Sequence, residues 1–203
     1  MKFKIVFYLF IFVCIILFFQ LINSNKLLNY QDDLIQSQNR LNLILKDSIK
    51  NISKDFPIKI IQQTSEKNIL LLKNFYFKNN IENIIFSFTK NFTQIIQQAD
   101  LCITRAGAST LAELSVLNTP FIAVPLPTSK DNHQLENANY YKNNDSCWVL
   151  EQSSFEEKIE EVLKDIIDNK SKYMKKKENL KKINHQNTWN NVNKKILEII
   201  NEN

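Results

Sequence analysis

The only glycine of this 203-residue chain, Gly107, stands where chemistry can be expected. It follows the apolar segment 101–104 and the pair Arg105-Ala106, and a helical pattern begins directly after it. A glycine at such a strand-to-helix turn permits either a positive φ or the close approach of a ligand to the backbone. The turn at Gly107 is therefore the first candidate binding element.

Three small residues, Ala108, Ser109 and Thr110, stand where the following helix is expected to begin. The first N–H groups of a helix have no partner within it and lie at the positive end of its dipole, so they attract phosphate. Ser109 or Thr110 could instead cap the helix with its side-chain oxygen. The two interpretations are compatible, because a cap leaves other N–H groups free.

A carboxylate follows about one turn into this helix, at Glu113, while Leu111 and Leu114 can face the core. Its two oxygens can accept hydrogen bonds from both hydroxyls of a ribose diol. The alternative is that Glu113 only offsets the positive end of the helix dipole.

Neutral polar side chains gather after the next apolar stretch, residues 121–124. Pro125 and Pro127 stiffen the loop that leaves this predicted strand, and a helix is expected to begin at Asp131 or Asn132. Hydroxyl, imidazole and amide groups in this position suit sugar hydroxyls and a diphosphate. The residues that carry them are Thr128, Ser129, His133, Gln134 and Asn137.

The composition excludes several other kinds of site. One glycine rules out the glycine-rich dinucleotide and Walker loops, and three cysteines without a Cys-x-x-Cys rule out a disulfide framework or a cysteine zinc site. Two histidines leave little for a histidine metal centre. The net charge of +5 accompanies a general richness in lysine, and no aromatic-spaced basic patch supports RNA or DNA binding. We expect no metal ion, no cofactor and no nucleic-acid partner.

Short apolar strands alternate with helices along most of the chain. This alternation is typical of an α/β fold, a parallel sheet with crossover helices that binds ligands at the carboxyl ends of its strands. We expect a Rossmann-like parallel sheet of about five strands with flanking helices. The predicted strands are 58–63, 83–88, 101–104, 120–124 and 147–150, and the predicted helices are 27–53, 66–78, 91–98, 109–117, 132–143, 154–168 and from about 170 to the end.

The N-terminal segment differs from the rest of the chain. Ile5 to Ile22 is apolar except for Gln20, and its length of roughly 18 residues is at the lower limit for a membrane-spanning helix. No small-x-small cleavage site follows, so we expect a hydrophobic helix that acts as an uncleaved anchor. A buried core segment, or a degenerate first strand folded back against the sheet, is the alternative.

Residues 99–138, ADLCITRAGASTLAELSVLNTPFIAVPLPTSKDNHQLENA, resemble the C-terminal donor-binding domain of MurG-type glycosyltransferases. The likeness rests on the pattern R-(S/A)-G-(A/S)-x-T-x-x-E, a P-x-P loop and D-x-x-Q-x-x-N-A, and it extends from about residue 57 to the C-terminus. These enzymes transfer N-acetylglucosamine (GlcNAc) from UDP-GlcNAc to a lipid-linked muramyl-pentapeptide in peptidoglycan synthesis. The resemblance implies one half of a two-domain GT-B fold and an inverting, UDP-GlcNAc-dependent hexosyltransferase.

The resemblance also implies a role for each motif residue, while Arg105 is expected to order its turn rather than touch the donor. The implied donor-binding residues are Phe88 and Thr89 at the uracil with Phe92 packed nearby, Gly107, Ala108, Ser109 and Thr110 at the diphosphate, Glu113 at the ribose, and His133, Gln134 and Asn137 among the polar groups at the sugar and phosphates.

The chain departs from the family in two respects. We expect these 203 residues to contain no acceptor-binding N-terminal domain, which carries the candidate base, and with one glycine they cannot contain the family's Gly-Gly-Ser loop. We therefore leave the catalytic residues unassigned and expect little transferase activity from this chain without an acceptor-binding partner subunit. The alternatives are a non-catalytic remnant, a membrane-anchored binding protein, or the donor half of another UDP-sugar lipid glycosyltransferase.

The expected organisation is a leader or membrane anchor at 1–25, a helical connector at 26–56 and a Rossmann-like UDP-sugar-binding domain at 57–203. Lys2 and Lys4 favour an N-terminus in the cytoplasm, whereas UDP-sugars require the C-terminal domain to be there. Lys26 and the lysine-rich tail 170–182 counter that bias. We expect a domain at the cytoplasmic face of the inner membrane, next to its lipid-linked acceptor.

Overall fold

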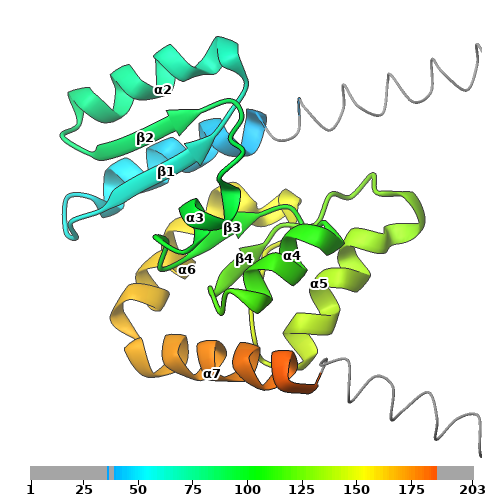
Figure 1. Ribbon diagram of the computed structural model, residues 1–203. Coiled ribbons are helices and arrows are strands. Elements are labelled where there is room, and N and C mark those ends of the chain that lie inside the picture. The colour runs from blue at the N-terminus through cyan, green and yellow to red at the C-terminus, as the bar shows by residue number, and fades with distance from the viewer. Residues whose placement is uncertain (1–35, 37–38, 187–203) are drawn as a thin grey trace, which may run out of the picture. The chain divides into compact units, whose positions relative to one another are not determined.

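The computed structural model describes residue 36 and residues 39–186 (Figure 1). The chain divides into two units, residues 1–43 and 44–203, and the elements below belong to the second unless stated. None of the helices in the described part is long and apolar enough to cross a membrane. The apolar run Ile5 to Ile22, expected as an anchor, lies outside the described residues.

All the strands of the described part pair in parallel, but they form two sheets instead of the one expected. In the first, β1 (Lys59–Gln63) pairs with β2 (Glu82–Phe86). In the second, β4 (Phe121–Ala123) lies between β3 (Cys102–Thr104) and β5 (Trp148–Val149). The expected α/β fold with parallel strands and flanking helices is confirmed. The division into two sheets was not predicted, because apolar runs identify strands without identifying their neighbours.

The helices agree closely with the sequence pattern. Residues 39–52 are helical, which is the described part of the longer helix expected over 27–53. The helices that follow are α2 (Glu66–Lys78), α3 (Phe92–Ile96), α4 (Ala108–Val116), α5 (His133–Asn143), α6 (Phe155–Asp168) and α7 (Lys170–Gln186), with short 3₁₀ turns η1 (Lys130–Asn132) and η2 (Gln152–Ser154).

The main hydrophobic core surrounds the three-stranded sheet. All three residues of β4 are buried, as expected for the central strand of a parallel sheet. Phe121 meets the ring of Tyr141 from α5 edge to face, with the ring centroids 5.3 Å apart. Helices α4, α5 and α7 contribute Leu111, Leu114, Ala138 and Leu180 to the same cluster. This packing fixes the two helices that begin beside the carboxyl ends of β3 and β4.

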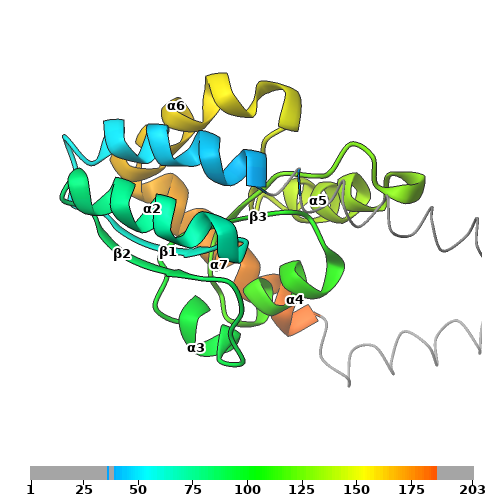
Figure 2. The ribbon, with the colours of Figure 1, turned by 90° about the horizontal axis from the view of Figure 1, so that it is seen from above.

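Helix α2 buries a narrow stripe against the two-stranded sheet. Leu72 and Tyr76 are fully buried, and the Tyr76 hydroxyl donates a hydrogen bond of 2.8 Å to Oε1 of Gln62 on β1. Helical residues 44–52 lie beside α2 (Figure 2), with the Lys46 Nζ 4.5 Å from the centre of the Phe75 ring. These contacts set the rotation of α2 about its axis.

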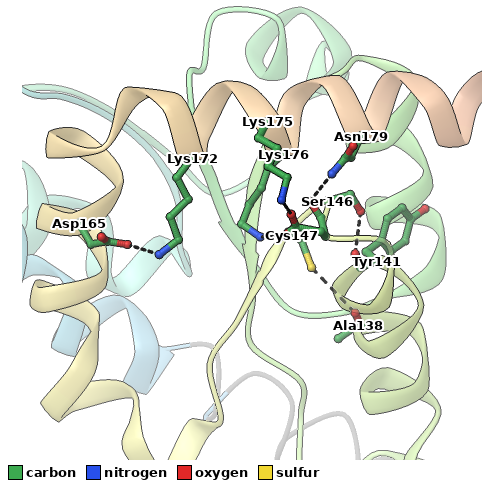
Figure 3. A network of polar contacts seen from close by, with 10 residues as sticks. Ala138, Tyr141, Ser146, Cys147, Asp165, Lys172, Lys175, Lys176 and Asn179 are labelled. Atoms are coloured by element: carbon green, nitrogen blue, oxygen red, sulfur yellow. Dashed lines mark hydrogen bonds and ion pairs between the residues drawn. The ribbon is translucent and has the colours of Figure 1, made fainter.

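Helix α7 is fastened to the turn between α5 and β5 by a cluster of charges (Figure 3). Asp145 accepts hydrogen bonds from Lys175 at 2.8 Å and Lys176 at 2.7 Å, and the Asn179 amide donates to the Asp145 carbonyl at 3.0 Å. The buried Lys176 also lies 5.0 Å from the ring centre of Trp148. Hydrogen bonds from the two lysines lower the pKa of Asp145 to about 2.

Asparagine and aspartate occupy every left-handed backbone position of the described residues. Their φ values lie between 48° and 56°, a region that L-residues other than these two rarely enter. Gly107, by contrast, has an ordinary φ of −68°. The left-handed residues are Asn80, Asn118, Asp131, Asn132 and Asp145.

Candidate functional site

The candidate site begins where β3 and β4 end. The two strands are parallel and in register, with Thr104 opposite Ala123. The turn 105–107 and the loop 124–129 therefore leave the same edge of the sheet next to each other. Parallel sheets bind their ligands at this edge.

Arg105 ties these two segments together. Its guanidinium donates to the Val124 carbonyl at 3.2 Å, to the Pro125 carbonyl at 3.5 Å and to Oε1 of Gln152 at 2.7 Å. Burial lowers the pKa of Arg105 to about 10, so the side chain stays charged at neutral pH. These contacts agree with the expected role of Arg105 in ordering the turn. The contact with Gln152 could not be predicted from the sequence, because Gln152 lies 47 positions further along the chain.

Two amide side chains of α5 fasten the same edge. Asn137 Nδ2 donates to the Ala106 carbonyl at 3.0 Å, and Gln134 Oε1 accepts from the Leu126 backbone N–H at 3.0 Å. Gln134 is buried, at 7% exposure. Both residues therefore shape the site, and Asn137 Oδ1 and Gln134 Nε2 are the groups that could still meet a ligand.

The turn before α4 differs from two expectations. Gly107 is the N-cap residue, with φ −68° and ψ 133°, so its backbone does not need the freedom of a glycine. A Cβ built at Gly107 would meet no atom within 4 Å. The helix has no side-chain cap, so the interpretation of Ser109 or Thr110 as a cap was wrong. Helix α4 starts at Ala108, one residue earlier than expected, so Ser109 and Thr110 both lie in its first turn.

The uncapped N-terminus of α4 leaves its first N–H groups available. The first hydrogen bond within the helix runs from the Leu111 N–H to the Gly107 carbonyl, at 3.0 Å. The N–H groups of Ala108, Ser109 and Thr110 precede it and receive no side-chain oxygen from the cap position. An incoming anion could accept from them.

Glu113 lies in the second turn of α4 and is exposed. Within the described part of the chain it has no recorded hydrogen bond or ion pair. The first turn of α4 carries no acidic residue, which removes the basis for interpreting Glu113 as a partner of the helix dipole. Among the described residues nothing occupies its carboxylate, whose two oxygens can each accept a hydrogen bond from a ligand.

The segment that leads into α5 has an unusual backbone. Asp131 and Asn132 both adopt left-handed conformations, and α5 begins at His133, slightly later than expected. The exposed His133 donates its Nδ1–H to the Lys130 carbonyl at 2.7 Å, because a carbonyl can only accept. In this tautomer Nε2 of His133 is the second ring nitrogen, which can bind another partner.

Hydroxyl groups of the preceding loop lie in contrasting environments. Thr128 is exposed, whereas Ser129 is 6% exposed and its Oγ has no hydrogen-bond partner among the described residues. A buried hydroxyl without a partner is uncommon and costs free energy. Ser129 therefore offers an unused donor and acceptor just before η1.

The aromatic residues expected at a base lie beyond the end of β2, in the other sheet. Phe88 is 73% exposed, and Thr89 uses its Oγ1 to accept from the Asn91 N–H at 3.0 Å. Phe92 packs against the main hydrophobic core at the start of α3. In the part of the chain that the structure covers, no recorded hydrogen bond joins Phe88 or Thr89 to the turn at Gly107.

Nucleophilic and metal chemistry find little support in the residues described. Burial raises the pKa of the Cys102 and Cys147 thiols to about 12, which keeps both protonated. Over residues 39–186, no group of three or more metal-binding side chains comes together. Among the described residues, the arrangement instead offers backbone N–H groups, the exposed carboxylate of Glu113 and several neutral polar groups.

The chain is similar to a known family over most of its length. The model of the glycosyltransferase family 28 C-terminal domain matches residues 35–192. A relative from Pelagibacter ubique (strain HTCC1062) is 47% identical over 161 residues, which are 79% of this chain and 45% of that protein. A relative from Rickettsia typhi (strain ATCC VR-144 / Wilmington) is 37% identical over 131 residues, or 63% of this chain and 34% of that protein.

Both relatives are named UDP-N-acetylglucosamine–N-acetylmuramyl-(pentapeptide) pyrophosphoryl-undecaprenol N-acetylglucosamine transferase. The crystal structure of Acinetobacter baumannii MurG superposes with a TM-score of 0.60 at 22% identity, over 68% of this chain and 40% of that one. This likeness establishes the fold. The chain spans less than half the length of each of these proteins.

Proposed function

The chain belongs to the glycosyltransferase family 28 C-terminal domain family, and from that membership we propose that it binds UDP-GlcNAc as the donor-binding half of a GlcNAc transferase. The acceptor would be a lipid-linked muramyl-pentapeptide of peptidoglycan synthesis, in keeping with the names of its relatives. The domain would occupy residues 57–203 and act at the cytoplasmic face of the inner membrane.

The observation that carries this proposal is the environment of Gly107. The fold does not require glycine there, because φ is −68° and a Cβ would stand in open space. Asparagine and aspartate fill the described backbone positions where glycine would relieve strain. The fold therefore does not explain the glycine at this position, and the close approach of a diphosphate to the α4 N-terminus would account for it.

The remaining donor contacts would come from Glu113, from the aromatic residue after β2 and from the polar side chains of α5. Glu113 would accept hydrogen bonds from both ribose hydroxyls. Phe88 would offer an exposed aromatic ring to the uracil, with Thr89 beside it. The sugar and phosphates would meet His133 Nε2, Gln134 Nε2 and Asn137 Oδ1.

The residues named above bind and orient the donor, and none of them is assigned as the general base. Inversion at the anomeric carbon requires a base that activates the acceptor hydroxyl. We propose that this base comes from the acceptor-binding half, in a further domain or a partner subunit. The chain alone is then expected to bind UDP-GlcNAc with little turnover.

Calorimetric titration of the full chain with UDP-GlcNAc tests the proposal. The Glu113→Gln variant removes a charged acceptor while keeping shape, and it should weaken binding by roughly 10- to 150-fold, the equivalent of about 1.5–3 kcal/mol. The matched control is Glu161→Gln, an exposed carboxylate on α6 that should leave the affinity unchanged. Equal effects of the two variants would contradict the assignment of Glu113.

The Gly107→Ala variant makes the sharper test. We expect its thermal stability to match or exceed that of the parent, since Cβ meets nothing and alanine loses less backbone entropy on folding. We expect its affinity for UDP-GlcNAc to fall at least tenfold. Unchanged affinity would show that no ligand approaches this turn closely.

A second candidate function uses the same scaffold with a different UDP-sugar and lipid acceptor. The loop 124–129 and the start of α5 would choose the sugar. A competition experiment with UDP-glucose, UDP-galactose and UDP-GlcNAc at one site distinguishes the two proposed functions. Absence of binding at millimolar UDP-GlcNAc in a folded sample would instead favour a remnant that keeps only the fold.

A further inference from the structure

Helix α2 presents large apolar side chains to solvent. Leu70 is 69% exposed, Phe77 is 79% exposed and Leu71 is 49% exposed. Leu70 and Phe77 are two turns apart and so share one side of the helix, away from the buried Leu72 and Tyr76. An amphipathic surface helix would ordinarily place polar residues there.

Three lysines and one acidic residue, Glu66, border these apolar residues. Lys67, Lys73 and Lys78 are all exposed, and none of them has a recorded ion pair within the described chain. At helical spacing, Lys73 lies on one side of the line from Leu70 to Phe77, and Lys67 and Lys78 lie on the other. We call these three lysines together with Leu70, Leu71 and Phe77 the outer face of α2.

The outer face cannot turn inward to bury its apolar residues. Tyr76 is held from below by its hydrogen bond to Gln62, at 2.8 Å, and Phe75 is held from the side by Lys46, 4.5 Å from its ring centre. A rotation that covered Phe77 would break both contacts. The exposure is therefore built into the packing of α2 on the two-stranded sheet.

We propose that the outer face of α2 binds the surface of an anionic lipid bilayer. Leu70, Leu71 and Phe77 enter the boundary between headgroups and acyl chains, and the lysines pair with lipid phosphates. An apolar stripe bordered by lysines is the pattern of helices that lie in the membrane interface. A protein partner fits less well, because lysine is depleted from protein–protein interfaces.

This proposal stands on α2 alone and does not require a working donor site. It agrees with a lipid-linked acceptor, because a domain held at the bilayer surface stays near such a substrate. The two proposals therefore fail separately: Glu113→Gln is expected to lower UDP-GlcNAc affinity and to leave vesicle binding unchanged.

Fluorescence quenching by brominated lipids locates the contact. The full-length Phe77→Trp variant is mixed with vesicles of phosphatidylcholine and roughly one third phosphatidylglycerol, with the acyl chains brominated. The control is Val116→Trp on α4, where the replaced side chain is 72% exposed. After subtraction of the parent signal, we expect strong quenching for Phe77→Trp and none for Val116→Trp. Equal quenching, or none in either variant, would overturn the proposal, because another part of the chain would then account for any vesicle binding.

Substitution of the lysines tests the charge complementarity. Changing Lys67, Lys73 and Lys78 together to glutamine should weaken vesicle binding about fivefold per lysine, or roughly 100-fold in all at low salt. The matched control changes Lys142, Lys158 and Lys181, which are exposed on α5, α6 and α7, and should shift the affinity less than about twofold. A similar loss in both triple variants, or self-association in lipid-free buffer that Phe77→Ser abolishes, would refute a specific lipid contact.

Discussion

At the scale of single residues, Arg105 shows how the candidate site is held in shape. Its planar guanidinium reaches two backbone carbonyls of the segment after β4 and the amide oxygen of Gln152. Lysine carries the same charge but cannot span these acceptors, since its ammonium is a single point. Arg105 is therefore a positioning residue for the turn that contains Gly107.

We expect Arg105→Lys to lower the free energy of unfolding by about 1.5–3 kcal/mol, the range for a lost hydrogen bond of a charged group. Urea unfolding of the full chain measures this change. Arg40→Lys is the matched control, because Arg40 is exposed, and it should stay within about 0.5 kcal/mol of the parent. A loss in Arg105→Lys no larger than that of the control would show that the fork of hydrogen bonds contributes little.

Long-range contacts explain what the sequence could and could not predict at this scale. The sequence shows that Glu113 and Gly107 have residue types suited to ligand binding. It also predicts that the turn at Gly107 follows a strand. The bonds from Asn137 to Ala106 and from Arg105 to Gln152 join segments 31 and 47 positions apart, and no local pattern encodes them. The ordinary φ of Gly107 was also hidden, because glycine is compatible with both signs of φ.

At the scale of elements, the attachment of α7 depends on one carboxylate. Asp145 has a pKa of about 2, below its ordinary value of 3.8, because Lys175 and Lys176 donate hydrogen bonds to it. A carboxylate whose pKa is lower in the folded state stabilises the fold above the ordinary value. That contribution is lost as the pH falls through the interval from about 4 to 2.

We expect Asp145→Asn to lower the free energy of unfolding near neutral pH by less than about 1 kcal/mol, since the carboxylate is half exposed and its ion pairs are screened. The difference from the parent should shrink as the pH approaches 2. Asparagine tolerates the left-handed φ of 48° at this position, so the substitution removes the charge and one of the two acceptor oxygens without straining the backbone. Denaturant titrations across this pH range check the result; a constant difference between the proteins would contradict it.

The elements themselves were largely predictable, and their partners were not. The bounds of α2 could be predicted because apolar residues recur at helical spacing along its 13 residues. Of the large side chains on this helix, however, Leu70, Leu71 and Phe77 are exposed, while Leu72 and Tyr76 are buried. When apolar residues lie around most of the circumference of a helix, the sequence does not indicate which side packs against the sheet.

At the scale of the whole molecule, the family match covers residues 35–192, and the chain spans less than half of each relative. Under the proposed function, the chain supplies the donor-binding half of the transferase. We expect mixing with an acceptor-binding half to raise turnover of UDP-GlcNAc well above that of the chain alone. A coupled assay for UDP release checks this, and robust turnover by the chain alone would contradict it.

The division of the strands into two sheets has a consequence for cooperativity. No pairing between the sheets is present in the described residues, so the pair β1–β2 can open while β3–β4–β5 stays closed. The amide of Ile122, in the fully buried β4, should then exchange with solvent only through global unfolding, whereas that of Ile84 should exchange through a smaller opening. Hydrogen exchange in low concentrations of denaturant would resolve two protection classes, and the turn at Gly107 would belong to the slower one.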